Sequence, residues 1–209
     1  MARNADSYQR RGGNQQGFPR VLIVPEGIKT ETYYLHRLKV VHGLSSVEIK
    51  HSGGTDPQSI VDFALAKIGE SDEWDRVYCV FDGDVDRHLA NALTKLRNSD
   101  PGKAGKLHAT LSVPCIEFWF LLHFVYTSKA YTRMASRTPC EAVQDDLKKH
   151  IPNYDKADKG LYDRLAPNLE AALVHGARLV KEQEKTGSAN PITYMHDLVG
   201  FLTTLKKSD

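Results

Sequence analysis

A short, almost continuously apolar run that ends in an aspartate constrains the fold of this chain more than any other feature. The run extends from Arg76 to Phe81, reads RVYCVF, and leads directly into Asp82. Runs of this length and composition are typical of strands buried on both faces, which occur mainly in parallel sheets covered by helices. We therefore expect an α/β protein in which helices flank a mainly parallel sheet.

Four apolar runs alternate with amphipathic stretches in the first part of the chain. The predicted strands are Val21 to Val24, Val47 to Lys50, Arg76 to Phe81 and Leu107 to Leu111. Helices are expected at Thr30 to Val41, from Pro57 onward, near His88 to Arg97, and at Ile116 to Phe124. Strands that alternate with helical patterns predict βαβ units, here with about four mainly parallel strands.

Composition divides the chain into three parts. Residues 1–18 are rich in Arg, Gln, Asn and Gly and lack the apolar core of a signal peptide, so we expect a disordered tail on a cytoplasmic protein. Residues 19–126 carry the α/β pattern. Residues 127–209 lack a strand signal, and we expect a helical extension packed on the first part. Its three helices are expected to begin at the capping box Thr138-Pro139-Cys140-Glu141, at Pro167, and at Asn190-Pro191.

Bulk composition excludes several classes of protein. The chain is 41% hydrophobic and 26% charged, as globular proteins are, and it has no apolar run of the ~20 residues that a membrane span needs. A formal net charge of +2 does not indicate extended coating of nucleic acid. The cysteines Cys79, Cys115 and Cys140 cannot all pair, and they are too widely spaced for a zinc site by themselves. We therefore expect buried, reduced thiols.

Acidic residues follow three of the predicted strands at the points where those strands end. Glu26 follows the first strand, Asp82, Asp84 and Asp86 follow the third, and Glu117 lies at the start of the helix after the fourth. Ligands of open parallel sheets bind beyond the carboxyl ends of the strands, so we expect these acids at one edge. Crowded carboxylates repel unless a divalent cation neutralises them, and oxygen ligands favour Mg²⁺ or Mn²⁺.

Each acidic residue also has a simpler interpretation. The segment from Asp82 to Asp86 suits a solvated loop before a helix, and Glu26 suits a turn before Gly27. Glu117 either completes a second metal site or only opens a helix. A solvated loop does not account for Glu26 opposite a second acidic strand exit, so we favour a metal site. The candidate catalytic residues are Glu26, Asp82 and Asp84, and the candidate metal ligands are these three with Asp86 and Glu117.

Residues near the strand exits are also candidates for phosphate or substrate binding. Lys29 and Thr30 open a helix, and helix N-termini bind anions through their backbone N–H groups. Alternatively, Thr30 only caps that helix and Glu31 only complements its dipole. Ser112 follows the fourth strand and is the third candidate. Four lysines either line an approach for a nucleic-acid backbone or form a solvated face: Lys148, Lys149, Lys156 and Lys159.

The pattern of strands and acids resembles two known groups of proteins. A glutamate after the first strand and an Asp-x-Asp after a later one resemble the Toprim fold. More narrowly, the segments VLIVPEGIKTETYYL, VYCVFDGDVD, LSVPCIEFWFLLHF and NPITYMHDLVGFL are together similar to RloB-like proteins, related to the AbiL-type second component. The resemblance extends from about Val21 to Leu202 and departs at Pro25 and at Gly83, where a larger residue is expected. It implies that Glu26 is a general acid or base and that two aspartates, Asp82 and Asp84, hold Mg²⁺.

The resemblance also implies a biological role. RloB-like proteins occur with restriction-modification or phage abortive-infection systems, often beside a large ATPase. We therefore expect a magnesium-dependent nuclease of phage defence that acts on DNA or on RNA, including tRNA, with an ATPase as a possible partner. The oligomeric state is not indicated.

Two other functions fit parts of the sequence. In a haloacid-dehalogenase-like phosphatase, VFDGDV would supply a nucleophilic Asp82 and an acid/base Asp84, with Ser112 after a later strand. That motif normally opens its domain, however, and Asp145-Asp146 falls inside a predicted helix. The third possibility is a regulatory subunit without enzymatic activity that docks on the ATPase.

Overall fold

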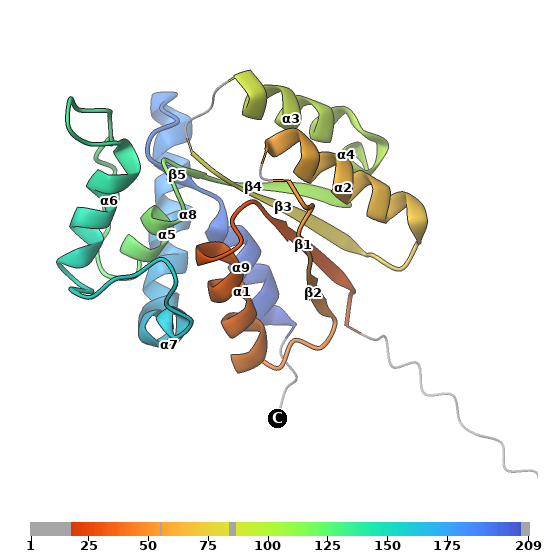
Figure 1. The fold of residues 1–209 in the computed structure, drawn as a ribbon, viewed down its shortest axis with the longest axis horizontal. Coiled ribbons are helices and arrows are strands. Elements are labelled where there is room, and N and C mark those ends of the chain that lie inside the picture. The colour runs from red at the N-terminus through yellow and green to blue at the C-terminus, as the bar shows by residue number, and fades with distance from the viewer. Residues whose placement is uncertain (1–17, 55, 84–86, 206–209) are drawn as a thin grey trace, which may run out of the picture.

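The structure is a computed structural model that describes residues 18–54, 56–83 and 87–205 (Figure 1). The strands are β1 (Val21–Pro25), β2 (Val47–Ile49), β3 (Arg76–Asp82), β4 (Leu107–Val113) and β5 (Ile192–Thr193). The helices are α1 (Thr30–Val41), α2 (Pro57–Glu70), α3 (Arg87–Asn98), α4 (Asp100–Lys103), α5 (Glu117–Leu121), α6 (Pro139–Lys148), α7 (Leu161–Leu165), η1 (Ala166–Asn168), α8 (Leu169–Thr186) and α9 (Met195–Thr204).

The strands form one sheet in the order β2-β1-β3-β4-β5. The first four are parallel and β5 is antiparallel to β4, which confirms the expected α/β class in a Rossmann-like arrangement. The chain moves outward from β1 to β2 and then returns past β1 to β3, so the strand order reverses between β1 and β3. A reversal of this kind opens a crevice beyond the carboxyl ends of the two strands, where ligands of such sheets bind.

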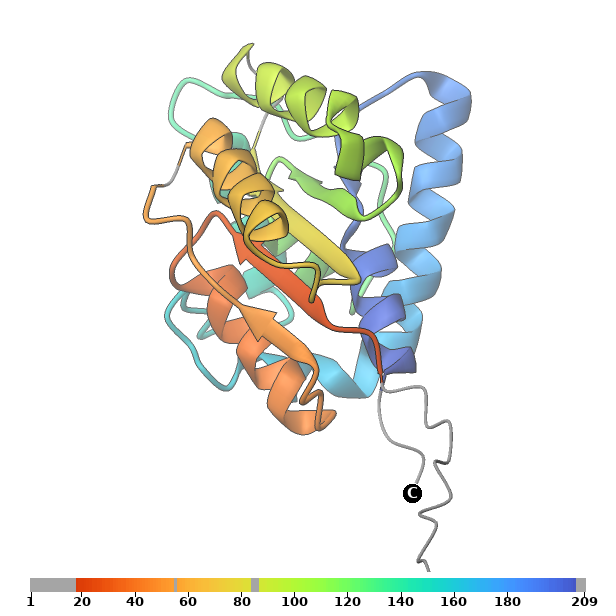
Figure 2. The same cartoon turned by 90° about the vertical axis from the view of Figure 1, so that its right-hand side faces the viewer.

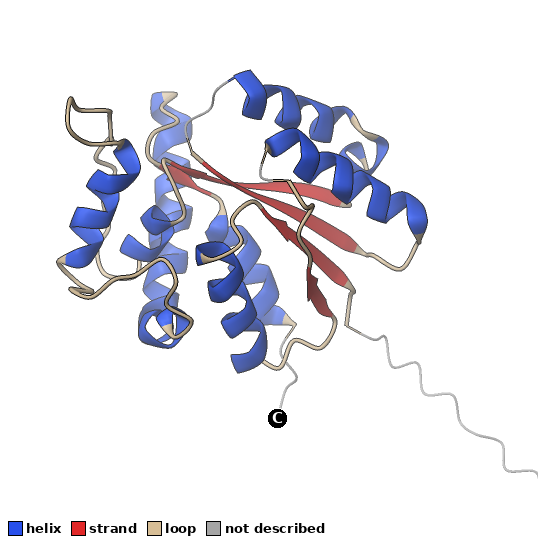
Figure 3. Ribbon diagram, viewed as in Figure 1, coloured by secondary structure: helices blue, strands red, loops and turns tan. Residues whose placement is uncertain are grey.

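Helices cover both faces of the sheet (Figure 3). In β1, Leu22 and Val24 pack with side chains of α2 and α3, whereas Val21 and Ile23 pack with α1, α5, α8 and α9. This alternation follows from the two-residue period of a strand, and both cores are apolar because the sheet is buried on both sides. Figure 2 shows α8 and α9 side by side at one edge of the molecule. None of the described helices is long and apolar enough to cross a bilayer.

The helix starts with the clearest sequence signals are confirmed. Asp56 caps α2 by accepting a hydrogen bond from the Ser59 backbone N–H at 3.1 Å. Thr138 and Glu141 form the expected capping box at the start of α6, where each side chain accepts from the other's backbone N–H. These caps satisfy donors that the first turn of a helix leaves without partners, so α6 has a start that depends on local residues alone.

The segment after Thr127 departs from the all-helical expectation. It contributes β5, which joins the sheet beside β4 through the pairs Ser112↔Thr193 and Val113↔Ile192. A strand of two residues is too short to produce a periodic pattern, so β5 has no recognisable signal in the sequence. The last helix begins at Met195 and not at Asn190-Pro191, because β5 and a turn intervene. Side chains of α6 to α9 share one core with α1 and α5.

The expectation of three reduced cysteines is wrong for two of them. Cys115 and Cys140 form a disulfide across 25 residues, and Cys79 is the free thiol, fully buried in β3. The count of three excluded complete pairing but did not exclude one pair. Sequence spacing did not reveal it, because the two cysteines meet only when α6 packs against α5.

Candidate functional site

The carboxyl ends of β1 and β3 bring acidic residues from separate segments to one cavity. Glu26 follows β1, Asp82 is the last residue of β3, and Glu117 begins α5 after β4. All three line a cavity of about 340 Å³ at the point where the strand order reverses. Asp84 and Asp86, the other candidate ligands, lie outside the described residues.

Backbone N–H groups hold two of the carboxylates in place. The Asp82 N–H donates to Oε2 of Glu26 at 3.0 Å, and the Ile116 N–H donates to Oδ1 of Asp82 at 2.8 Å. The first bond links the exit of β1 to that of β3, and the second links β3 to the turn that begins α5. The positions of Glu26 and Asp82 therefore depend on the sheet itself, and sites held by strands are positioned more precisely than sites on loops.

Gly83 follows Asp82 in a conformation that explains its departure from the family pattern. Its φ of 102° lies in the region that favours glycine, and its N–H donates to the Ser112 carbonyl at 3.1 Å. A larger residue here would strain the backbone immediately after the Asp82 carboxylate. Glycine therefore lets the chain turn at the end of β3 while it stays bonded to β4.

Glu31 is a fourth acid of the cavity, and the sequence interpretation missed its role. It lies in the first turn of α1, a position that by itself indicates only a partner of the helix dipole, but it is 5% exposed and lines the cavity. Its carboxylate occupies the space beside Gly27, since a Cβ at position 27 would lie 2.0 Å from Oε2 of Glu31. The Glu-Gly pair followed by a second glutamate five residues after the first was the signal that could have identified it.

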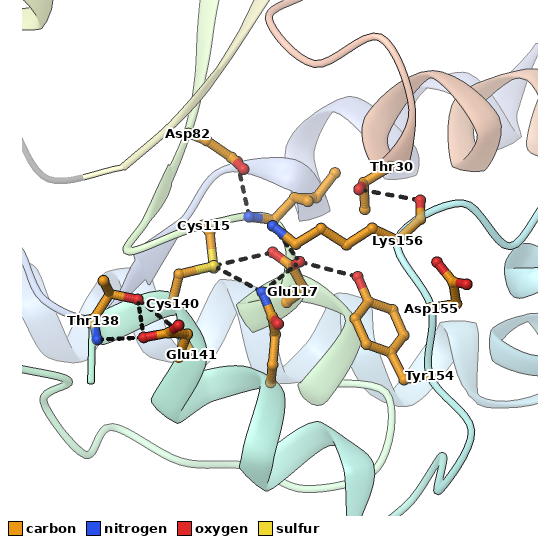
Figure 4. A network of polar contacts seen from close by, with 12 residues as sticks. Thr30, Asp82, Cys115, Glu117, Thr138, Cys140, Glu141, Tyr154, Asp155 and Lys156 are labelled. Atoms are coloured by element: carbon orange, nitrogen blue, oxygen red, sulfur yellow. Dashed lines mark hydrogen bonds and ion pairs between the residues drawn. A yellow bond between two sulfur atoms is a disulfide. The ribbon is translucent and has the colours of Figure 1, made fainter. Parts of the chain in front are cut away.

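Glu117 is the most enclosed of the four acids, with 1% exposure. Figure 4 shows the polar contacts around it. Its Oε1 accepts from the Tyr154 hydroxyl at 3.0 Å and from Nε2 of Gln144 at 3.1 Å, and Nζ of Lys156 lies 3.3 Å away. These partners come from α6 and from the connection between α6 and α7. Sequence analysis assigned a role to neither Tyr154 nor Gln144, because only tertiary packing brings them to the strand exits.

Burial and crowding raise the pKa of two carboxyl groups in the cavity. Burial is the largest cause for Asp82, whose pKa lies well above its usual value, and the charges of Glu31, Glu117 and Glu26 raise it further. The pKa of Glu31 is also raised, first by burial and then by Glu117, while Lys156 opposes the shift. Two lysines, Lys29 and Lys156, line the cavity beside the four acids. The four acids therefore outnumber the two lysines beside them.

The donor set of the cavity fits a hard divalent cation. Carboxylate oxygens are ligands that Mg²⁺ and Mn²⁺ favour, and a cation would stabilise the charged form of Asp82, whose pKa is raised first by burial and then by the neighbouring acids. Among the described residues, the only group of three His, Cys, Asp or Glu ligand atoms within 4.8 Å of one another is Cys115, Glu117 and Cys140, and its two sulfur atoms are joined in a disulfide. The four acids line the cavity at wider spacing. This suits Mg²⁺, which keeps several water ligands and takes few from protein.

The candidate substrate-binding residues are divided between the cavity and the core. Lys29 and Thr30 line the cavity, and the Thr30 hydroxyl donates to the Lys156 carbonyl at 3.3 Å instead of capping α1. Ser112 is fully buried, and its hydroxyl lies 2.9 Å from that of Thr193 in β5. The structure therefore brings Lys29 and Thr30 to the acids but holds the Ser112 side chain in the sheet.

Comparison with known proteins identifies the family of the chain. The family described as RloB-like protein matches residues 21–202, which is most of the 209-residue chain and contains every described residue of the cavity. Searches of curated proteins and of solved structures find no significant match. The chain belongs to the RloB-like family.

Proposed function

We propose that this protein is a Mg²⁺-dependent nuclease of the Toprim type, with Mn²⁺ as an alternative cation, that hydrolyses phosphodiester bonds in DNA or RNA, including tRNA. The observation that carries the proposal is the cavity at the reversal between β1 and β3, where Glu26, Glu31, Asp82 and Glu117 meet beside two lysines. Buried carboxylates in excess of nearby cations favour a divalent ion, and a cation beside basic side chains is suited to a phosphate substrate.

The four acids have different roles in this proposal. Asp82 and Glu31 would hold the cation together with Asp84, which lies outside the described residues, and Glu117 would support a second ion or orient the first. When bound, Mg²⁺ supplies Lewis-acid stabilisation of the charge on the phosphate and leaving oxygens. Glu26 is oriented by the Asp82 N–H and exchanges a proton with the attacking water.

Lysines at the rim of the cavity would bind the substrate backbone. Nζ of Lys156 lies 3.3 Å from Glu117, and its side chain is 54% exposed, so it reaches both the acids and solvent. Lys29 is exposed at the N-terminus of α1, where backbone N–H groups also favour anions. These contacts neutralise phosphate charge without reading bases, so they do not distinguish DNA from RNA.

The family suggests the biological setting of the activity. RloB-like proteins occur in restriction-linked and phage-defence systems, including abortive infection, often beside an ATPase. We propose the same setting here, with cytoplasmic nucleic acid as substrate and an ATPase as partner. A non-enzymatic subunit of that ATPase is the alternative, and loss of defence on substitution of Asp82 would exclude it.

The phosphatase alternative has less support in the described residues. Its motif requires a further acid beside Asp82, and the sequence offers Asp145 and Asp146 on α6. Asp145 instead pairs with Arg137 at 2.6 Å, and Asp146 accepts from the Tyr131 hydroxyl at 2.9 Å. Beryllium fluoride would distinguish the two functions, because a phosphatase nucleophile traps it on Asp82 and the proposed nuclease does not.

The direct test is Mg²⁺-dependent cleavage of labelled DNA and RNA by purified variants. Glu26→Gln removes the proton acceptor with little change in shape, and we expect cleavage to fall by about 10²- to 10⁴-fold. Glu73→Gln, which alters an exposed acid far from the cavity, should cleave like the wild type. Equal cleavage by the Glu26→Gln and wild-type proteins would contradict the proposal.

A further inference from the structure

A disulfide joins the segment that carries Glu117 to the helix that contacts it. Cys115 lies two residues before Glu117, and Cys140 lies in the first turn of α6, with 5.8 Å between their Cα atoms. Figure 4 shows the sulfur atoms on one side of the Glu117 carboxylate and the Tyr154 and Lys156 side chains on the other. Oxidation or reduction of this cysteine pair would therefore change the immediate surroundings of Glu117.

The two carboxylate oxygens of Glu117 have different neighbours. Oε1 has nitrogen and oxygen donors from Gln144, Tyr154 and Lys156. Oε2 lies 3.4 Å from Sγ of Cys140. A disulfide sulfur carries no proton and cannot donate a hydrogen bond, whereas a thiol can. Reduction would therefore give Oε2 a donor that competes with any cation for that oxygen.

The disulfide also fixes the helix that orients Glu117. Gln144 lies one turn after Cys140, and its Nε2 is 3.4 Å from Sγ of Cys140 as well as 3.1 Å from Oε1 of Glu117. The capping box of Thr138 and Glu141 stabilises the start of α6 independently of the sulfur atoms. Reduction is thus expected to change the contacts of Glu117 and not to unfold α6.

Cys140 is the accessible end of the pair. Its side chain is half-buried, whereas Cys115 is 3% exposed and Cys79 is fully buried. A dithiol reductant can attack Sγ of Cys140, which breaks the Sγ–Sγ bond and releases Cys115. The second thiol of the reductant then closes its own disulfide and frees Cys140. Two electrons and two protons pass from the reductant to the two cysteines.

We propose that Cys115 and Cys140 form a reversible thiol–disulfide site that sets the availability of Glu117 to the divalent cation. The inference rests on the proposed function, in which Glu117 faces that cation. The disulfide form leaves Oε2 without a sulfur donor and ties α6 in place, so it binds Mg²⁺ more tightly. The dithiol form occupies Oε2 with the Cys140 thiol and requires more Mg²⁺.

The test compares the full chain oxidised with diamide and reduced with dithiothreitol, with thiols counted by alkylation and mass spectrometry. Mg²⁺ is titrated against two readouts, cleavage of labelled nucleic acid and thermal stabilisation of the protein. We expect the half-saturating Mg²⁺ concentration to be about five- to tenfold higher in the dithiol form, the size of one hydrogen bond. Equal concentrations in the two forms, or a higher one in the disulfide form, would overturn the inference.

Variants distinguish the effect of the disulfide between Cys115 and Cys140 from other effects of diamide and dithiothreitol. Cys140→Ser keeps a permanent donor beside Oε2 and cannot form the disulfide, so it should require the higher Mg²⁺ concentration in both reagents. Cys79→Ala, which alters the buried thiol of β3, should respond like the wild type. A redox response that persists in Cys140→Ser would contradict the inference.

The two readouts separate failure of this inference from failure of the proposed function. If neither form cleaves but their Mg²⁺-dependent thermal shifts differ as expected, the nuclease proposal fails and the redox site stands. If cleavage requires Mg²⁺ equally in both forms, the nuclease proposal stands and the redox site is refuted.

Discussion

The acidic residues at the two ends of the sheet have different surroundings. At the amino end, Arg20 contacts Glu48 at 2.9 Å and Glu73 at 2.5 Å, its N–H donates to Asp75, and its guanidinium lies over the Trp74 ring. These charges are partly exposed and paired. At the carboxyl end, Asp82, Glu31 and Glu117 are enclosed together, and burial and mutual repulsion raise the pKa of Asp82.

This difference indicates a structural role for the charges at the amino end of the sheet and a functional role for the acids at its carboxyl end. Exposed, paired charges contribute little free energy and do not require a ligand. Enclosed carboxylates that outnumber the cations beside them reduce stability and are most readily explained by a bound cation or substrate.

Glu31→Gln should separate the two ends most clearly. The change removes one carboxylate from the cavity and preserves its shape, so we expect cleavage to fall by about 10²-fold or more through weaker cation binding. Glu48→Gln, at the amino end, should leave cleavage unchanged. Gly27→Ala offers an independent route to the same loss, because its Cβ would displace the Glu31 carboxylate. The comparison would fail if Glu31→Gln and Glu48→Gln cleaved at equal rates.

Lys156→Met tests the basic side of the cavity. Loss of the ammonium beside Glu117 would remove the proposed phosphate contact, and we expect steady-state cleavage to slow by up to about 10²-fold. The matched variant Lys159→Met removes a lysine from the same connection whose ammonium lies over the Tyr33 ring. A greater loss in Lys159→Met than in Lys156→Met would place substrate binding outside the cavity.

The pH dependence of stability should differ between wild type and Asp82→Asn. The pKa of Asp82 is higher in the folded protein than in the unfolded chain. The contribution of this carboxyl group to the stability of the fold is therefore fully present below its pKa in the unfolded chain, and it is lost as the pH rises through its pKa in the folded protein. In EDTA, thermal denaturation of the wild type should therefore show stability falling from acidic to neutral pH. Asp82→Asn should reduce this slope and raise the neutral-pH melting temperature, while losing stabilisation by Mg²⁺. An unchanged slope would contradict a raised pKa of Asp82 in the folded protein.

Arg20→Ala should have the smallest effect. Its ion pairs with Glu48 and Glu73 are about half exposed, and such pairs contribute about 0.2–1 kcal/mol each. We expect a slight decrease in the free energy of unfolding by urea denaturation, with Mg²⁺-dependent cleavage unchanged. Reduced cleavage without loss of stability would show that the two ends of the sheet are coupled.

The sequence predicted the parts of the fold that arise from local patterns. The parallel strands could be located from their apolar runs, such as Val77 to Phe81 in β3, and α2 and α6 could be located because Asp56 and Thr138 cap them. β5 could not, because two residues have no period. The disulfide could not, because Cys115 and Cys140 meet only through packing of α5 against α6.

The candidate site was predictable to the same extent. Glu26, Asp82 and Glu117 follow strands, and parallel strands place their carboxyl ends together, so their meeting in one cavity could be inferred. Two contacts required tertiary structure. Glu31 enters the cavity because Gly27 leaves room for it, and Tyr154 reaches Glu117 from 37 residues away in the sequence.

Binding of a divalent cation in the acidic cavity at the carboxyl end of the sheet is the property on which the proposed function depends. Crystals of the full chain soaked in Mn²⁺ and measured for anomalous scattering test it most directly. We expect a peak beside Glu31 and Asp82, which Asp82→Asn crystals should lack. Full soaking with no peak in this cavity, or a peak only among the paired acids around Arg20, would contradict it.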